Sequence, residues 1–303
     1  MLVPRMFRRR HRSQSARARS GIVAILGAGL VSSSPILRAE TWNLSAAGSW
    51  NSAANWNPAS IPNAPGAAVI FNGAATALNP AQTGNRSVTL DAPQTVGSIH
   101  FNNDLLTFTN SLTAGSGGAL TFDAVDAGPA TITTTGTQTG NNTISARITL
   151  TDSLLAVVNN TTATSAAGSL NLTAAISGAG GFTKEGPGLA TFGTGAKTYQ
   201  GPTVLNAGRM RISFAAAPTG TSSFTINSGA QLTLTTDQTY TFGPGPLNLN
   251  GSGALAGPFA AFPGAIRNDR NLAATITNPV VLQSDTLLHV QGAATGSLTF
   301  PNV

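Results

Sequence analysis

Three aspartates have neighbours that could, by residue type and spacing, support carboxylate catalysis. Asp123 and Asp126 are the only acids within three residues of each other, and Asp269 lies between Arg267 and Arg270. Enzymes that cleave polysaccharides require clustered carboxylates, usually with a basic residue nearby. A solvated turn explains each of these aspartates more simply, so we predict no catalytic role for them.

Other catalytic chemistry has little support in the sequence. The chain has no Cys, which excludes thiol catalysis and thiolate metal sites. After residue 39 the only histidines are His100 and His289, which are far apart and lack the spacing of metal ligands. Neither a Gly-x-Ser-x-Gly elbow nor a phosphate-binding loop occurs. We therefore predict a non-enzymatic protein with no catalytic residue, cofactor or metal site.

The three tryptophans of the chain form a second candidate site. Trp42, Trp50 and Trp56 are each followed by Asn, and their spacings of eight and six residues place them on one face of an extended chain. Aromatic faces beside amides bind sugars by stacking and hydrogen bonding. The alternative, which we prefer, is an N-terminal cap that covers the open end of a repetitive fold.

The charge of the chain belongs to its first 39 residues. The formal net charge is +6, which favours a nucleic-acid partner when taken alone. Eight of the 16 basic residues precede residue 40, where no acid occurs, and the remaining eight are outnumbered by ten acids. The chain after residue 39 thus has a net charge of −2, and we predict that it binds no nucleic acid.

The N-terminal 39 residues have the layout of a secretory signal peptide. Residues 1–20 are basic, residues 21–31 are apolar, and a polar stretch ends at Ala39, where we expect cleavage. The apolar run is about half of the ~20 residues that span a bilayer, so we expect no transmembrane anchor. Arg8-Arg9-Arg10 leaves open whether export uses the general or the twin-arginine route. The alternative is a disordered basic arm retained in the cytoplasm.

The remaining chain is built from short segments that alternate apolar residues with Thr, Ser or Asn. Such alternation is typical of half-buried strands, and Gly, Asn, Pro or Ser bounds each segment. No helical apolar stripe occurs after the leader, so we predict an all-β fold. The expected strands are residues 87–90, 106–109, 119–122, 131–133, 148–150, 170–173, 224–226, 231–234 and 297–300.

Weak internal echoes favour a parallel β-helix, or β-solenoid. Residues 115–122, 228–234 and 292–300 share a Gly-rich turn followed by a Leu-Thr strand. Coils of roughly 20–25 residues would stack on the order of ten to thirteen times. We expect a Trp-rich N-terminal cap over residues 40–86 and the solenoid over residues 87–303. A β-sandwich is the alternative fold.

Residues 177–212 closely resemble the autotransporter-associated β-strand repeat. They read SGAGGFTKEGPGLATFGTGAKTYQGPTVLNAGRMRI, with Phe182 in place of the usual Leu and Lys197 in place of the common Asn. The matching positions are Gly178, Gly180, Gly181, Thr183, Lys184, Gly186, Gly188, Leu189, Gly193, Thr198, Tyr199, Gly201, Thr203, Val204 and Gly208. The Trp-rich residues 41–71 are similar to the start of many exported proteins of this family.

The resemblance implies a right-handed parallel β-helix displayed outside the cytoplasm, without catalytic residues. Read physically, Gly178, Gly180 and Gly181 permit positive φ or close backbone approach at a corner. We expect Lys184 and Glu185 at an exposed turn, with a structural role for Lys184. The residues expected to fill the interior are Phe182, Leu189, Phe192 and Val204.

We thus expect a structural or adhesive protein, displayed at or released from a bacterial cell surface. The alternative is a β-helix protein that binds or cleaves carbohydrate. The partners we expect are surface glycans or other cell-surface proteins. A sheet edge exposed by the last coil also predicts self-association.

Overall fold

The structure is a computed structural model. It describes residues 39–77, 79–102, 107–136, 139–160, 169–212, 217–254, 261, 263–269, 272–291 and 296–302. These residues belong to one compact unit, Leu37–Val303. All of the predicted signal peptide except Ala39 lies outside the described residues.

The regular secondary structure of the described chain is almost entirely β-strand, which confirms the all-β prediction; its one short 3-10 helix is η1 (Ala53–Asn55). The strands form four sheets. Sheet A contains β1 (Ala39–Trp42), β3 (Trp56–Asn57), β4 (Ala68–Asn72), β7 (Ser98–Asn102), β10 (Ala130–Thr135), β13 (Leu154–Val158), β16 (Phe182–Glu185), β18 (Thr203–Leu205), β20 (Phe224–Ile226), β23 (Leu247–Gly251) and β26 (Val280–Thr286). Sheet B contains β2 (Gly48–Ser49), β5 (Arg86–Leu90), β8 (Asn110–Ala114), β11 (Asn142–Ile144), β14 (Leu170–Leu172), β17 (Leu189–Phe192), β19 (Gly208–Ile212), β21 (Ala230–Leu234), β24 (Ile266–Asn268) and β27 (Leu288–Val290). Sheet C contains β6 (Pro93–Val96), β9 (Ala119–Phe122), β12 (Arg147–Leu150) and β15 (Ile176–Gly178), and sheet D contains β22 (Gln238–Tyr240), β25 (Ala273–Ile276) and β28 (Ser297–Thr299).

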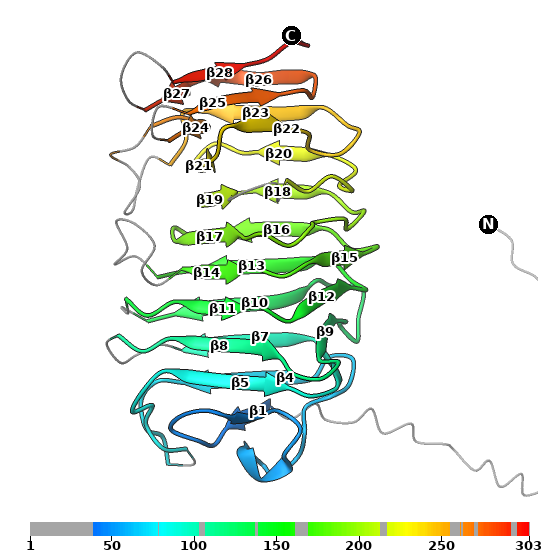
Figure 1. The fold of residues 1–303 in the computed structure, drawn as a ribbon, viewed down its shortest axis with the longest axis vertical. Helices are drawn as coiled ribbons and strands as arrows, with labels where there is room; N and C mark the ends of the chain where they lie inside the picture. Colours follow the sequence, from blue (N-terminus) through cyan, green and yellow to red (C-terminus); the bar gives the residue numbers. More distant parts are fainter. Residues whose placement is uncertain are drawn as a thin grey trace, which may run out of the picture. The chain divides into compact units, whose positions relative to one another are not determined.

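The strands follow one another through the sheets in rotation. From β4 onward the chain passes through sheet A, then sheet B, then sheet C or D, and returns to sheet A beside the strand that it left (Figure 1). Where two of these circuits lack a strand of sheet C, single parallel bridges at Lys197 and Pro218 continue its ladder. Among the described strands, all neighbours pair in parallel except β1 and β3. Parallel pairing argues against a β-sandwich, whose sheets are antiparallel.

The circuits differ in length. Phe182 pairs with Thr203 and Thr203 pairs with Phe224, so these two successive circuits are short and equal. Leu247 pairs with Val280, which makes that circuit distinctly longer. The expected repeat length therefore fits the short circuits and is too small for the long ones, because longer turns lengthen individual circuits. The β23–β26 pair that ends the long circuit also has a register shift between Leu249 and Gly251.

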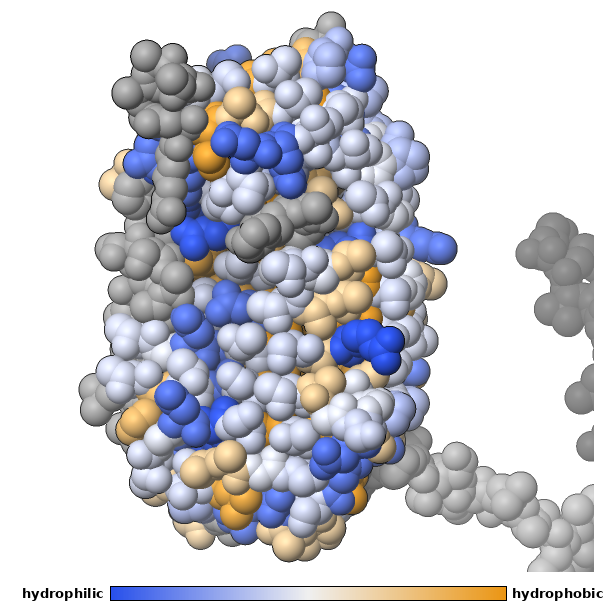
Figure 2. Space-filling view, in the orientation of Figure 1, coloured by the Kyte–Doolittle hydropathy of each residue, from blue (hydrophilic) through white to orange (hydrophobic). Residues whose placement is uncertain are grey.

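Alternating burial along the strands builds one core from the inward side chains. The Phe71 and Phe101 rings stack with centroids 5.3 Å apart, and the Phe182 and Phe192 rings lie 4.8 Å apart. Many of the Thr, Ser and Asn side chains on the strands point outward, although Asn110, Asn142 and Thr203 are buried. The face in Figure 2 is mostly of intermediate hydropathy, with hydrophilic and apolar residues scattered over it.

One predicted strand is misplaced. The segment 106–109 was expected to form a strand, but residues 107–109 are not in one, and β8 begins at Asn110. The reason is a buried amide: Asn110 accepts a hydrogen bond from Arg86 (3.0 Å) and donates one to Asn142 (3.0 Å). This ladder aligns the starts of three strands of sheet B.

The region that resembles the β-strand repeat needs two corrections. Val204 is half-buried and faces outward, while its neighbours Thr203 and Leu205 are buried. Leu189 is buried, but it packs against Ala254 outside the main core. Both errors have one cause: in this segment the phase of the alternation shifts at the turns, so sequence position alone does not tell which residues point inward.

Candidate functional site

A concave surface lies where sheet C leads into sheet A. The turn between β9 and β10 separates two pockets of about 330 and 540 Å³ there. The pockets share Gly128 and Pro129 of that turn. We call the two pockets together the corner groove.

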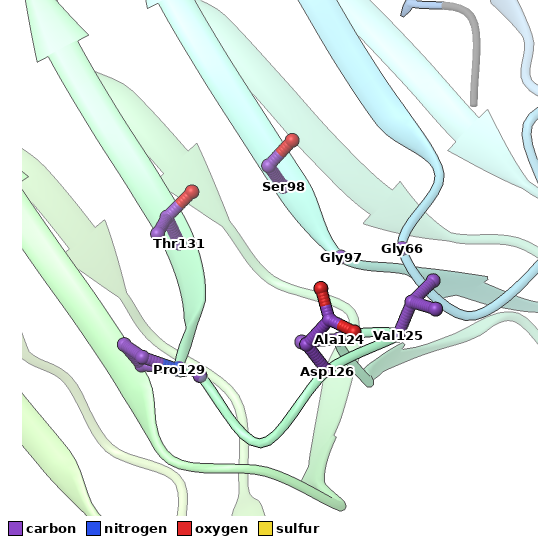
Figure 3. Close-up of a pocket in the computed structure, with 9 residues that line it drawn as sticks. Gly66, Gly97, Ser98, Ala124, Val125, Asp126, Pro129 and Thr131 are labelled. Carbon is purple, nitrogen blue, oxygen red and sulfur yellow. The ribbon is translucent and has the colours of Figure 1, made fainter. Parts of the chain in front are cut away.

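Hydroxyl and carboxylate groups line the corner groove together with apolar side chains, among them the exposed Val125. In the smaller pocket, Ser98 and Thr131 project to the same side of neighbouring strands, with Asp126 on the turn beside them (Figure 3). Asp152 and Thr183 line the larger pocket. Of the described residues that line either pocket, none is basic or aromatic.

Side chains tie successive turns of the corner groove together. The Asp152 carboxylate accepts a hydrogen bond of 2.7 Å from the backbone N–H of Ala124. The Ser153 hydroxyl accepts one of 3.0 Å from the backbone N–H of Gly181. Each bond joins a turn to the turn of the next circuit, so the wall of the groove is held in one arrangement.

The structure separates the acidic pair predicted from the sequence. Asp126 lines the corner groove, whereas Asp123 is not among its lining residues. Asp152, which the sequence reading did not single out, lines the groove one circuit later. The signal that could have found it is positional, since Asp123 and Asp152 both follow shortly after a strand of sheet C.

Asp269 forms an ionic cluster, although not with both of its sequence neighbours. Its carboxylate pairs with Arg267 Nε at 2.5 Å and with Arg209 at 3.0 Å. Arg270, the other expected partner, lies outside the described residues. Arg209 also donates to the Thr233 hydroxyl (2.6 Å). Burial lowers the pKa of Arg209 to about 10, and Asp269 opposes this shift. The two arginines are at most 4% exposed and Asp269 is 13% exposed, so the cluster has little access to a substrate.

The three tryptophans gather in one buried cluster. Trp56 contacts Trp42 and Trp50 edge to face, with centroids 5.0 and 4.8 Å apart, and Phe71 packs against all three. Trp50 Nε1 donates to the carbonyl oxygen of Pro62 and Trp56 Nε1 to that of Trp50. All three side chains are at most 1% exposed, so they offer no free face for a sugar ring. This geometry supports the capping interpretation over glycan stacking.

Lys184 is buried, so the expectation of an exposed turn is wrong. It points inward from β16, and its ammonium donates to the carbonyl oxygens of Glu185, Gly186 and Ala207 at 2.7–3.0 Å. Burial lowers the pKa of Lys184 to about 7, while the nearby Glu185 raises it. The carbonyl contacts join two successive turns and support a structural role.

Lys197 repeats this arrangement on sheet C. Its ammonium donates to the carbonyl oxygens of Ala174 (2.8 Å), Gly193 (3.4 Å) and Gly195, and lies 5.3 Å from the centroid of the Phe192 ring. Burial lowers the pKa of Lys197 to about 8. Sequence reasoning missed this residue, because it treated Lys197 only as a departure from Asn in the repeat.

The other repeat residues fall at turns and close contacts. Gly186 and Gly208 have φ of +75° and +68°, which favours glycine. Tyr199 is buried, and its hydroxyl lies 2.6 Å from the Thr203 hydroxyl. The neighbouring residues that pack backbone against backbone, with no space for a Cβ atom, are Gly180, Gly181, Gly188 and Gly201.

Within the described ranges, no group of three or more acidic or histidine side chains is arranged to hold a metal ion. No helix in the same ranges is long and apolar enough to cross a membrane. No family model matches the chain, and neither a curated protein nor a solved structure does. Membership of the autotransporter-associated repeat family therefore stays a prediction from residues 177–212.

Proposed function

We propose that residues 40–303 form a right-handed parallel β-helix that acts as an exported structural or adhesive protein at a bacterial cell surface, without catalysis. The observation that carries the proposal is the rotation of the strands. From β4 onward, each circuit adds one parallel strand to sheet A and one to sheet B. A β-helix requires this order, because each coil must stack on the coil before it.

The way in which the fold is stabilised makes disulfides unnecessary. The chain has no cysteine, and its buried ladder side chains and turn contacts supply cross-links between circuits instead. Few charges and many hydroxyl and amide groups cover the strands. Such a scaffold presents turns at regular positions, which suits binding to another surface better than catalysis.

A carbohydrate-binding role is the second candidate, and the corner groove favours it. The groove combines a concave shape with hydroxyl and carboxylate groups. Carbohydrate cleavage has weaker support, because Asp269 is held between two arginines. Depolymerase activity of the purified protein that disappears in Asp123→Ala or Asp269→Ala would overturn the non-enzymatic assignment.

Cell fractionation with protease accessibility tests the proposed location. We expect the chain in the surface or extracellular fraction, starting near Glu40, and open to protease in intact cells. Recovery in the cytoplasm with residues 1–39 attached would contradict export. A crystal structure with antiparallel, face-packed sheets would contradict the β-helix and leave the location untouched.

A further inference from the structure

The corner groove crosses several circuits at right angles to the strands. Ser98 pairs with Thr131, Thr131 with Leu155, and Leu155 with Thr183. At a strand spacing of about 4.8 Å, the hydroxyl groups of Ser98 and Thr183 bound a stretch of ~14 Å. A ligand that follows the groove is therefore extended. It meets the hydroxyl groups of Ser98, Thr131 and Thr183, while on the circuit of the apolar Leu155, which lines neither pocket, Asp152 supplies a polar group.

The lining groups select the chemistry of that ligand. Ser98, Thr131 and Thr183 can donate and accept hydrogen bonds, whereas the carboxylates of Asp126 and Asp152 can only accept them. The ligand must therefore be rich in donors. An anionic ligand would meet two carboxylates and, among the described lining residues, no basic group.

We infer that the corner groove binds a neutral polysaccharide whose chain runs along the groove from circuit to circuit. Vicinal sugar hydroxyls supply the donors that the two carboxylates need, and they exchange hydrogen bonds with the hydroxyl groups of the wall. This inference names a ligand for the proposed adhesive protein. Its biological meaning rests on the proposed function, because only a surface protein would meet such a polysaccharide outside the cell.

The wall of the corner groove is arranged before any ligand arrives. The Asp152–Ala124 and Ser153–Gly181 hydrogen bonds join successive turns. A Cβ atom on Gly180 would lie 2.1 Å from the Asp152 carbonyl oxygen, so the backbones there are in direct contact. Little reordering is then needed on binding, which lowers the entropic cost of association.

Gly128 offers a way to block the groove without disturbing the fold. It lies between the two pockets, and a Cβ atom on it would meet no atom within 4 Å. Gly84 has the same open surroundings and lines neither pocket. Gly128→Trp and Gly84→Trp are therefore a matched pair, one inside the groove and one outside.

Calorimetry and a glycan array on the purified full-length chain test the inference. The probes are neutral oligosaccharides of two to eight sugars (gluco-, xylo-, manno- and chito-series), with oligogalacturonate as the anionic comparison. We expect at least one neutral series to bind, with affinity that rises with chain length until the groove is filled. Gly128→Trp and Thr131→Val should each weaken binding about tenfold or more, and Gly84→Trp should leave it unchanged.

Binding of oligogalacturonate alone, or of no neutral series by a folded chain, would overturn the inference. So would a neutral ligand whose affinity is the same in Gly128→Trp and Thr131→Val as in the parent. Circular dichroism of each variant verifies its fold. These binding results do not depend on where the protein is located in the cell. A surface-exposed chain that binds no neutral glycan would therefore overturn the inferred ligand class and leave the proposed scaffold role standing.

Discussion

The ammonium groups of Lys184 and Lys197 act as hydrogen-bond donors inside the protein. Each lies among three backbone carbonyl oxygens that come from two successive circuits. The Asn278 side chain plays a related part without a charge, since its Nδ2 lies 2.8–3.1 Å from the carbonyl oxygens of Phe242, Gly243 and Gly245, all in one turn of the preceding circuit. A buried nitrogen donor thus satisfies turn carbonyls that water cannot reach.

Lys184→Met should lower the free energy of unfolding by about 1–3 kcal/mol, because buried carbonyl groups lose their donor. Chemical denaturation followed by circular dichroism measures the change. Arg147→Met is the matched control, since Arg147 is exposed on β12 and its loss removes a charge only. Equal stabilities of the two variants would argue against a structural role for the Lys184 ammonium.

The stability of the protein should rise between pH 7 and about pH 10. Burial lowers the pKa of Lys184 from 10.5 to about 7 and that of Lys197 to about 8, so the folded state releases these protons first. The unfolded state then binds more protons across this range, and the free energy of unfolding increases with pH. Above about pH 10 the buried Tyr199, whose pKa is raised by burial, acts in the opposite direction.

Denaturant midpoints at pH 7, 8 and 9 measure this dependence. The increase should be smaller in Lys184→Met, because one of the two titrating groups is removed. A parent protein whose stability stays constant or falls over this range would contradict the prediction.

At the scale of the elements, close packing between turns depends on particular glycines. Gly180→Ala should destabilise the protein by about 1–3 kcal/mol, because the new Cβ atom would overlap the backbone of Asp152. Gly84→Ala is the control, since its Cβ atom would have open space. Thermal unfolding compares the two. A Gly180→Ala variant as stable as Gly84→Ala would show that the turns can separate without cost.

Trp42 of β1 and Trp56 of β3 place the aromatic cluster at one end of sheet A, and we expect it to cap the core there. Trp56→Ala should cost about 3–5 kcal/mol of stability, because Trp56 lies between Trp42, Trp50 and Phe71. Val125→Ala, at a side chain that is 61% exposed, is the control. We also expect hydrogen exchange in Trp56→Ala to increase first in β1 and β4. Exchange that increases evenly along the whole chain would argue against a local cap.

At the scale of the whole molecule, the last described circuit exposes apolar side chains that continue buried columns. Leu282 pairs in register with the buried Leu249 but is 60% exposed, and Leu288 pairs with the buried Ile266 and is 38% exposed. Among the described strands, β26, β27 and β28 each have a neighbour on one side only. Such an edge is a template for another strand.

The purified chain should therefore self-associate with increasing concentration, and Leu282→Lys should weaken this association. Analytical ultracentrifugation over a hundredfold range of concentration measures it, with Thr149→Lys on exposed sheet C as the control. A parent chain that stays strictly monomeric throughout would contradict the prediction.

Much of the local structure follows from the sequence. Residues 119–122 and 224–226 alternate apolar residues with Thr and form β9 and β20 at those positions. This works because a period of two depends only on neighbouring residues. The all-β composition of the fold follows for the same reason. Of the three glycines expected to have positive φ or close backbone contacts, Gly178 has a positive φ of +113°, and Gly180 and Gly181 lie against neighbouring backbone.

Three features were decided only by the tertiary structure. They are the burial of Lys184, the start of β8 at Asn110, and the grouping of Asp126 with Asp152. Each depends on contacts between residues a whole circuit apart, and the circuits differ in length, as the Phe182–Thr203 and Leu247–Val280 pairs show. Local periodicity does not encode these lengths. Since a shift of one residue in register reverses which side chains point inward, the groove and the buried cations emerge only when the circuits are stacked.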